Sequence, residues 1–160
     1  MVSYLQNSVV GLALLISISG GCSHEYVPNT SVEDTEENRR ILEFVDEYRR
    51  AVEKRDAGRL LSLTSVNYFD DMGTPVGDDD IDYQTLQKGL KRMREEILDA
   101  RYQIRYRGVT YVDNRALVDI LYTGWFRVNT EEGPQWRRRL TSHRLVVALE
   151  GGRYKIVSGM

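Results

Sequence analysis

The chain has 160 residues, of which 41% are hydrophobic, and a formal net charge of −2 at pH 7. This length fits one domain with its own core, and the near-neutral charge argues against nucleic acid as a partner. One cysteine and two histidines exclude an intramolecular disulfide and argue against a zinc site. We therefore expect no metal and no cofactor.

The first 24 residues differ in composition from the rest, because no Asp, Glu, Lys or Arg occurs before Glu25. The apolar run of residues 9–18 has the length of a signal-peptide core and is short for a membrane-spanning helix, which needs roughly 20 residues. Small residues follow at positions 19–21, directly before Cys22. This order predicts a targeting segment that is removed from the mature protein.

The "SGGC" that ends at Cys22 resembles the lipobox of bacterial lipoproteins, with Ser19 in place of the usual leucine. The resemblance implies a signal peptide over residues 1–21, acyl chains such as palmitate on Cys22, and a flexible tether over residues 22–35. It also implies a membrane anchor in the bacterial cell envelope, and in a Gram-negative host Ser23 favours the outer membrane. Plain secretion, a membrane-inserted N-terminus and a cytoplasmic protein are the alternatives.

Helical periodicity marks three segments before residue 100. The first begins near Ser31 or Thr35, and its apolar residues recur at spacings of three and four. Asp56 is a favourable N-cap for a short second helix, and the aspartates at 78–82 precede a third. The apolar residues are Ile41, Phe44, Val45, Tyr48, Ala51 and Val52 in the first helix and Tyr83, Leu86, Leu90, Met93 and Ile97 in the third.

The acidic residues Asp78, Asp80 and Asp82 imitate the first ligand positions of a calcium-binding EF-hand loop. The imitation ends there, because the sixth position is Tyr83 instead of glycine and the twelfth is Gly89 instead of glutamate. Negative charge at a helix N-terminus explains the cluster better than calcium does.

After residue 99 the apolar period changes to two, which indicates strands. Helices followed by a strand meander predict an α+β fold. We expect three N-terminal helices packed on a curved, cone-like antiparallel sheet of four main strands plus one short strand. The short strand is expected at 66–69, and the main strands begin at about residues 102, 116, 135 and 153.

Three stretches in this order resemble the nuclear transport factor 2-like (SnoaL-like, cystatin-like) superfamily. They are "FVDEYRRAVEKRDAGRLLSL" in the helix pair, "YFDDMG" at the short strand and "RLVVALEGGRYKIVSGM" in the closing hairpin. The resemblance implies such a domain over residues 36–160. The superfamily contains isomerases, dehydratases and hydrolases, and also non-catalytic modules that bind partners or dimerise through the sheet, so the site must decide the function.

The resemblance also implies two catalytic candidates: Tyr48 as a donor to a developing oxyanion and Asp70 as a proton-moving base. An apolar pocket would strengthen both roles. A second candidate pair comes from the residues alone, because Asp119 and His143 lie on neighbouring predicted strands. A register that sets them opposite each other would form an acid–base dyad. The alternative is structural for all four: a core tyrosine, a loop aspartate and a polar strand pair.

Basic and aromatic residues concentrate on the predicted strands, among them Trp125, Trp136 and Arg139. They indicate a pocket or partner surface, or else a solvated outer face. We expect a lipid-anchored binding module that takes a second copy of the chain, an unknown envelope protein or a small apolar ligand. The alternative is a small-molecule isomerase, dehydratase or hydrolase with an apolar pocket between helices and sheet.

Overall fold

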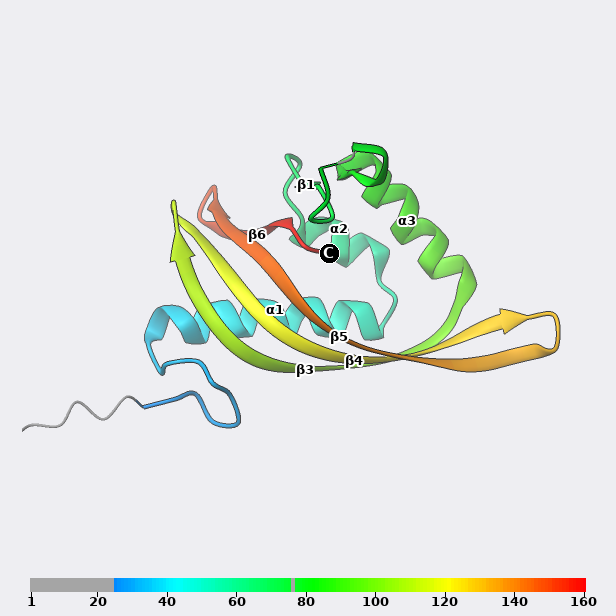
Figure 1. Cartoon of the computed structure of the whole chain (residues 1–160), viewed down its shortest axis with the longest axis horizontal. Coiled ribbons are helices and arrows are strands. Elements are labelled where there is room, and N and C mark those ends of the chain that lie inside the picture. The colour runs from blue at the N-terminus through cyan, green and yellow to red at the C-terminus, as the bar shows by residue number, and fades with distance from the viewer. Residues whose placement is uncertain (1–24, 76) are drawn as a thin grey trace, which may run out of the picture.

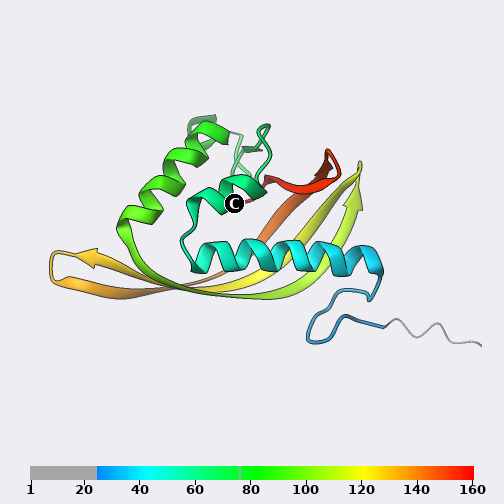
Figure 2. The same ribbon diagram turned by 180° about the vertical axis from the view of Figure 1, so that it is seen from behind.

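The computed structural model describes residues 25–75 and 77–160 as a curved antiparallel sheet with three helices on its concave side (Figure 1). The view from behind shows the longest helix, α1 (Glu36–Glu53), lying along the sheet (Figure 2). The expected signal peptide and Cys22 lie outside the described residues. Within the described part, no helix is both long and apolar enough to cross a membrane.

α1 begins at one of the two caps that the sequence predicts. The side chain of Thr35 accepts a hydrogen bond from the Asn38 amide over 3.1 Å, and Glu36 and Glu37 place negative charge in the first turn. One face of the helix is buried, as its spacing of three and four residues predicts. The buried apolar residues of α1 are Ile41, Leu42, Phe44, Val45, Tyr48, Ala51 and Val52.

Aspartates cap the other two helices, α2 (Ala57–Leu63) and α3 (Tyr83–Glu96). Asp56 accepts from the Arg59 amide over 2.9 Å, and Asp82 accepts from the Thr85 amide over 2.7 Å. Asp56 is the cap that the sequence predicts, and Asp82 belongs to the aspartate group that is expected before the third helix. In the described ranges, no three His, Cys, Asp or Glu side chains are placed to hold a metal ion.

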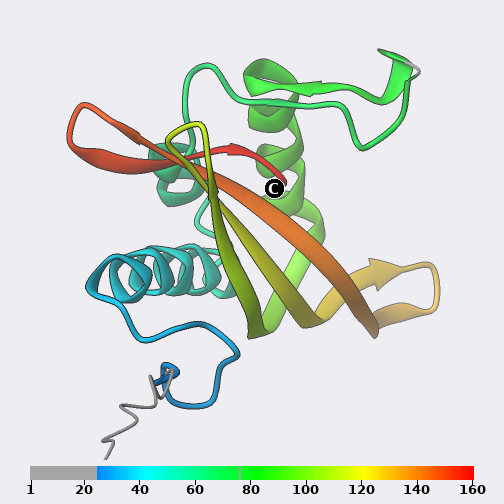
Figure 3. The ribbon, with the colours of Figure 1, turned by 60° about the vertical axis from the view of Figure 1, so that its left-hand side comes forward.

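The segment between α2 and α3 contains a short antiparallel strand pair that is separate from the main sheet (Figure 3). The sequence predicts one short strand at 66–69, but the structure places it at β1 (Phe69–Asp70) and adds β2 (Ile81–Asp82) as its partner. Two residues are too few to show a period, so β2 left no signal in the sequence. A 3₁₀ turn, η1 (Gly77–Asp79), lies between the two strands.

The main sheet is a meander of long, bent strands. β3 contains register shifts between Ile97 and Asp99 and between Tyr106 and Gly108, and such bulges increase bending. The β4–β5 hairpin projects beyond the helices (Figure 1). The strands are β3 (Ile97–Val112), β4 (Arg115–Thr130), β5 (Gly133–Glu150) and β6 (Arg153–Ser158), hydrogen-bonded in that order.

The core lies between α1 and the concave, inner face of the sheet. Because successive strand residues point to opposite faces, the register sorts every residue of β4 and β5 to the inner or the convex, outer face. Val45 of α1 and Val118, Ile120 and Leu145 of the sheet are at most 1% exposed. The three sheet residues mark the inner face, and Val45 belongs to the same buried cluster.

Side chains of the α1–α2 region cover the free edge of β3. Glu53 accepts a hydrogen bond from the Tyr102 amide over 3.1 Å, and Arg55 donates to the Ile97 carbonyl over 2.6 Å. An uncovered edge would offer unpaired backbone groups to another strand. The two contacts satisfy backbone groups at this end of the β3 edge.

Residues 25–35 are not the flexible tether that the sequence predicts for this stretch. A bridge joins Tyr26 to Glu33, Val32 is 1% exposed, and the Ser31 amide donates to the Tyr106 carbonyl over 3.3 Å. The segment has no helix or strand period, so only its contacts with the domain reveal the order. The folded unit therefore includes residues 25–35 and does not begin at residue 36.

Candidate functional site

Tyr48 lies on the buried face of α1 and meets Tyr102 of β3. The two rings are edge to face with centroids 6.2 Å apart, and a hydrogen bond links the two hydroxyl groups. Burial raises the pKa of Tyr48 to about 12 and also raises the pKa of Tyr102. Both side chains are therefore neutral phenols at physiological pH.

A row of rings fills the interior where the sequence analysis expects a pocket. Tyr102 and Tyr122 have centroids 4.8 Å apart, and Tyr122 meets His143 edge to face at 6.1 Å. Tyr48, Tyr68 and Tyr102 are 6%, 2% and 4% exposed. Leu86 and Leu90 of α3 belong to the same buried cluster.

Asp70 binds the chain's own backbone. Its Oδ2 accepts from the Gly159 amide over 2.7 Å and from the Tyr68 hydroxyl over 3.2 Å, while the Tyr68 oxygen accepts from the Met160 amide over 2.9 Å. His143 Nε2 lies 2.7 Å from the Gly159 carbonyl oxygen. Since a carbonyl can only accept, the imidazole carries a proton on Nε2. The structure thus joins Asp70 and His143 through Gly159.

Asp119 and His143 do not form the dyad that opposite positions would allow. Asp119 pairs with Arg144 in the β4–β5 register, and Ile120 pairs with His143. This one-residue offset sends Asp119 to the outer face and His143 to the inner face. Asp119 accepts two hydrogen bonds from Arg144 instead, over 2.7 and 3.1 Å.

The residues expected on one pocket or partner surface divide between the two faces. Trp125 pairs with Arg101 of β3 and Arg138 of β5, so these three share the outer face. Arg139 is the next residue along β5 and points to the inner side, where its charge acts on the Tyr102 hydroxyl. Three consecutive arginines therefore do not form one patch.

Exposed apolar and aromatic side chains stand beside arginines on the outer face. The guanidinium of Arg101 lies 5.2 Å from the Trp136 ring centre, and that of Arg138 lies 5.9 Å from the Trp125 ring centre. Leu140 is 54% exposed. We call the following residues the outer-face patch: Arg101, Gln103, Arg105, Leu121, Thr123, Trp125, Trp136, Arg138 and Leu140; they line two adjoining hollows of about 620 and 440 Å³.

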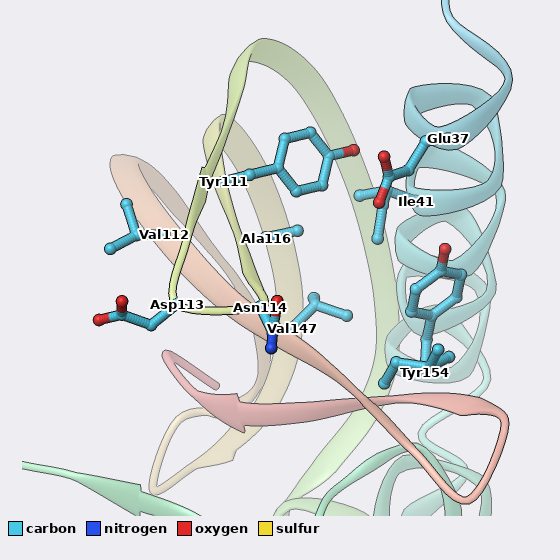
Figure 4. A pocket seen from close by; sticks show the side chains of 10 residues that line it. Glu37, Ile41, Tyr111, Val112, Asp113, Asn114, Ala116, Val147 and Tyr154 are labelled. Carbon is cyan, nitrogen blue, oxygen red and sulfur yellow. The ribbon is translucent and has the colours of Figure 1, made fainter.

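Another hollow, of about 540 Å³, lies at the other end of the sheet beside the first turns of α1 (Figure 4). Ile41 and Val147 give it an apolar floor, and Glu37, Tyr111 and Tyr154 bring polar groups to it. No sequence pattern marks these three polar residues as a site. They come from three different elements, so no local spacing connects them.

Sequence reasoning also missed Tyr68, Tyr102 and Gly159 as partners of the predicted site residues. Tyr68 had a usable signal, because it stands two positions before Asp70 and such residues share a side of an extended chain. Gly159 has a φ of +84°, but nothing near it in sequence marks its distant contacts.

Comparison with known proteins shows similarity at the level of structure. No family model and no curated protein matches the sequence. A candidate scytalone dehydratase from Novosphingobium aromaticivorans aligns with a TM-score of 0.65 and 13% identity, over 77% of this chain and 80% of that one. A nuclear transport factor 2-like superfamily protein from Salmonella enterica aligns with a TM-score of 0.62 and 12% identity, over 76% and 86%.

A third solved structure covers more of the chain. It is a candidate association domain of calcium/calmodulin-dependent protein kinase II from Xanthomonas campestris, with a TM-score of 0.62 and 15% identity over 84% of this chain and 92% of that one. At these identities the similarity concerns the fold alone.

Proposed function

We propose that this chain, which has the nuclear transport factor 2-like fold, is a lipid-anchored protein of the bacterial cell envelope that binds an acidic protein partner through its outer-face patch. One observation carries the proposal: on the patch, the guanidinium groups of two arginines lie over the rings of two tryptophans. The fold is shared by ligand-binding proteins and by isomerases and dehydratases, so it does not choose between them.

The sheet interior supports binding over catalysis. A catalytic base or donor must come within hydrogen-bond distance of a substrate atom. Tyr48 is hydrogen-bonded to Tyr102, while Asp70 and His143 are both hydrogen-bonded to Gly159. The chain itself thus occupies the positions that a substrate would need.

Charge favours an acidic protein over a second copy of the chain. The residues that line the two hollows include Arg49, Arg101, Arg105 and Arg138 and a single acidic residue, Glu53. Glu53, which lines the same hollows, is already paired with Arg49 at 2.6 Å. Two copies packed face to face would bring the arginines together, and like charges oppose association. Trp and Arg are the side chains most enriched among residues that dominate protein interfaces.

The lipid anchor at Cys22 rests on the sequence. The apolar run of residues 9–18 and the small residues before the cysteine support it. Each methylene of an acyl chain contributes about 0.8 kcal/mol to membrane binding, so several chains together would hold the protein firmly. Globomycin should block processing, and Cys22→Ala should release the protein from the membrane fraction; an unchanged soluble product in both experiments contradicts the anchor.

The binding proposal is tested by capturing partners from a membrane extract with the full chain and its variants. Arg138→Glu reverses a charge on the patch, and Leu140→Ser removes an apolar contact. Val66→Ser is the control, because Val66 is 73% exposed and lies outside the patch. We expect one acidic protein that binds wild type and the control, is lost with both patch variants, and dissociates at high salt.

Light scattering on the same proteins measures the oligomeric state. If the wild-type chain is a dimer and the patch variants are monomers, the patch binds a second copy of the chain and not an acidic partner. Capture that survives both patch variants would contradict the proposed surface.

A second candidate function is small-molecule chemistry, because the structure brings two side chains that can transfer protons, Asp70 and His143, to one residue near the end of the chain, Gly159. If residues 159–160 moved aside, the Asp70 carboxylate would be free to accept a proton. The test is hydrogen–deuterium exchange at the α-carbon of a cyclic ketone, followed by NMR. Exchange that Asp70→Asn abolishes supports this function, and exchange no faster than with Asp70→Asn rejects it.

A further inference from the structure

We propose that the 540 Å³ hollow beside the first turns of α1 binds a primary alkylammonium group. This site is independent of the proposed function, because it lies away from the outer-face patch. Its volume falls in the range of small-molecule sites, about 300–1,000 Å³. Ile41, Ala116 and Val147, at 1%, 5% and 1% exposed, form an apolar floor for an alkyl chain (Figure 4).

The oxygen of Tyr111 can only accept a hydrogen bond from a ligand in this hollow. Its single proton is donated to Asn38 Oδ1 over 2.7 Å. Asn38 is 6% exposed, and its Nδ2 donates to the Glu33 carbonyl over 2.9 Å, which fixes the amide orientation. The remaining lone pairs of the phenol oxygen are therefore acceptors.

Glu37 supplies a second acceptor and a negative charge. Its carboxylate and the Tyr111 hydroxyl point toward one another in the hollow (Figure 4). Burial raises the pKa of Tyr111 to about 12, and the nearby charge of Glu37 adds to this rise. The Tyr111 oxygen and the Glu37 carboxylate are both acceptors, so a ligand that binds between them must donate hydrogen bonds. A positively charged donor forms the strongest bonds of this kind.

No Lys or Arg of the described residues forms an ion pair with the Glu37 carboxylate. The residues that line the hollow include no Lys or Arg. The ion pairs of the described chain leave Glu37 out, although its neighbour Glu36 is paired with Arg40. The rings of Tyr111 and Tyr154 add faces that attract a cation.

An ammonium on a straight alkyl chain fits all these features. The N–H groups reach Glu37 and the Tyr111 oxygen, and the chain covers Ile41 and Val147. The same chemistry occurs in a free alkylamine and in a lysine side chain of another protein. The experiment separates these sources.

Calorimetry with the full chain in detergent measures binding of n-hexylammonium, with hexanoate as the anionic counterpart. We expect n-hexylammonium to bind and hexanoate not to bind. Glu37→Gln keeps the size of the side chain and should weaken binding about tenfold, since it removes the charge from a charge-assisted hydrogen bond. Glu36→Gln makes the same chemical change one residue away and should bind like wild type.

Two further probes sharpen the result. Hexyltrimethylammonium keeps the charge but has no N–H, so it should bind more weakly than n-hexylammonium. Nα-acetyl-lysine methylamide carries the same ammonium next to a peptide backbone. Binding equal to that of n-hexylammonium identifies a protein lysine as the source, and much weaker binding identifies a free amine.

Three results would overturn the site. They are absence of n-hexylammonium binding, equal binding of hexanoate, and equal losses in Glu36→Gln and Glu37→Gln.

Discussion

Asp70 and His143 both form hydrogen bonds with the backbone of Gly159. Asp70 accepts from the Gly159 amide and His143 donates to the Gly159 carbonyl, each over 2.7 Å. Both residues are catalytic candidates when the sequence is considered alone. In the fold they hold the end of β6 against β1 and β5. This arrangement predicts effects on stability that a surface loop aspartate would not have.

Asp70→Asn should lower the free energy of unfolding by about 1–2 kcal/mol, because hydrogen bonds to a charged acceptor are the stronger ones. Asp71→Asn is the control, since Asp71 is exposed and accepts from the Gly73 amide of its own turn over 3.0 Å. Urea unfolding of both variants checks the difference. Equal losses would show that the Gly159 contact contributes nothing.

Gly159→Ala should be more damaging than an ordinary glycine substitution. The φ of Gly159 is +84°, and a Cβ there would lie 2.0 Å from the Arg144 carbonyl oxygen. Strain and the backbone clash together should cost about 3 kcal/mol or more. Gly133→Ala has a φ of +101° and open space around the added Cβ, so it should cost about 1–2 kcal/mol. A smaller loss for Gly159→Ala than for Gly133→Ala in thermal unfolding would contradict this packing.

Val32→Ala tests whether residues 25–35 belong to the folded unit. Val32 is 1% exposed, and removing its two methyl groups should cost about 2 kcal/mol. Val66→Ala removes the same atoms from a side chain that is 73% exposed and should cost almost nothing. If the Val32→Ala protein is as stable as the Val66→Ala protein, residues 25–35 are a flexible tether and not part of the folded unit.

Alkaline pH should weaken the fold through Tyr48. Its pKa is about 12 in the folded chain and near 10.0 when unfolded, so the folded state holds the proton more tightly. The corresponding stability, about 3 kcal/mol, is fully present below pH 10 and is lost as the pH rises to 12. Thermal unfolding between pH 9 and 12 should show a shallower fall for Tyr48→Phe than for wild type.

Tyr26→Phe is the control for this titration, because Tyr26 is 53% exposed. Its fall in melting temperature with pH should match that of wild type. If Tyr48→Phe also matches wild type, the buried phenol does not drive the alkaline loss.

The three helices and the four long strands could be predicted from the sequence because each shows a local signal. Thr35, Asp56 and Asp82 are caps with an apolar period directly behind them. The partners of Asp70 and His143 could not be predicted, because a contact such as that between Asp70 and Gly159 depends on how distant segments meet. The proposed dyad failed for a related reason: period-two alternation places residues on faces but does not set the register between strands.

The ordered segment around Val32 was also beyond sequence reasoning. Its composition is polar and aperiodic, and a single buried valine gives no pattern. Alternation along β5 separates Trp136 from Arg139, which are three positions apart, so the prediction of one surface for both residues was wrong. The cross-strand pairs, which alternation does not supply, are what place Trp125 of β4 on the same face as Arg101 and Arg138.

Site-specific photo-cross-linking in cells that produce the full chain tests the central claim most directly. A photoreactive phenylalanine derivative replaces Leu140 within the patch in one variant and Val66, which lies outside the patch and outside the hollow beside α1, in the other. We predict an adduct with one acidic envelope protein from position 140 and none from position 66. An adduct from position 66 alone, an adduct of the chain with itself, or no adduct at position 140 would contradict binding of an acidic partner through the outer face.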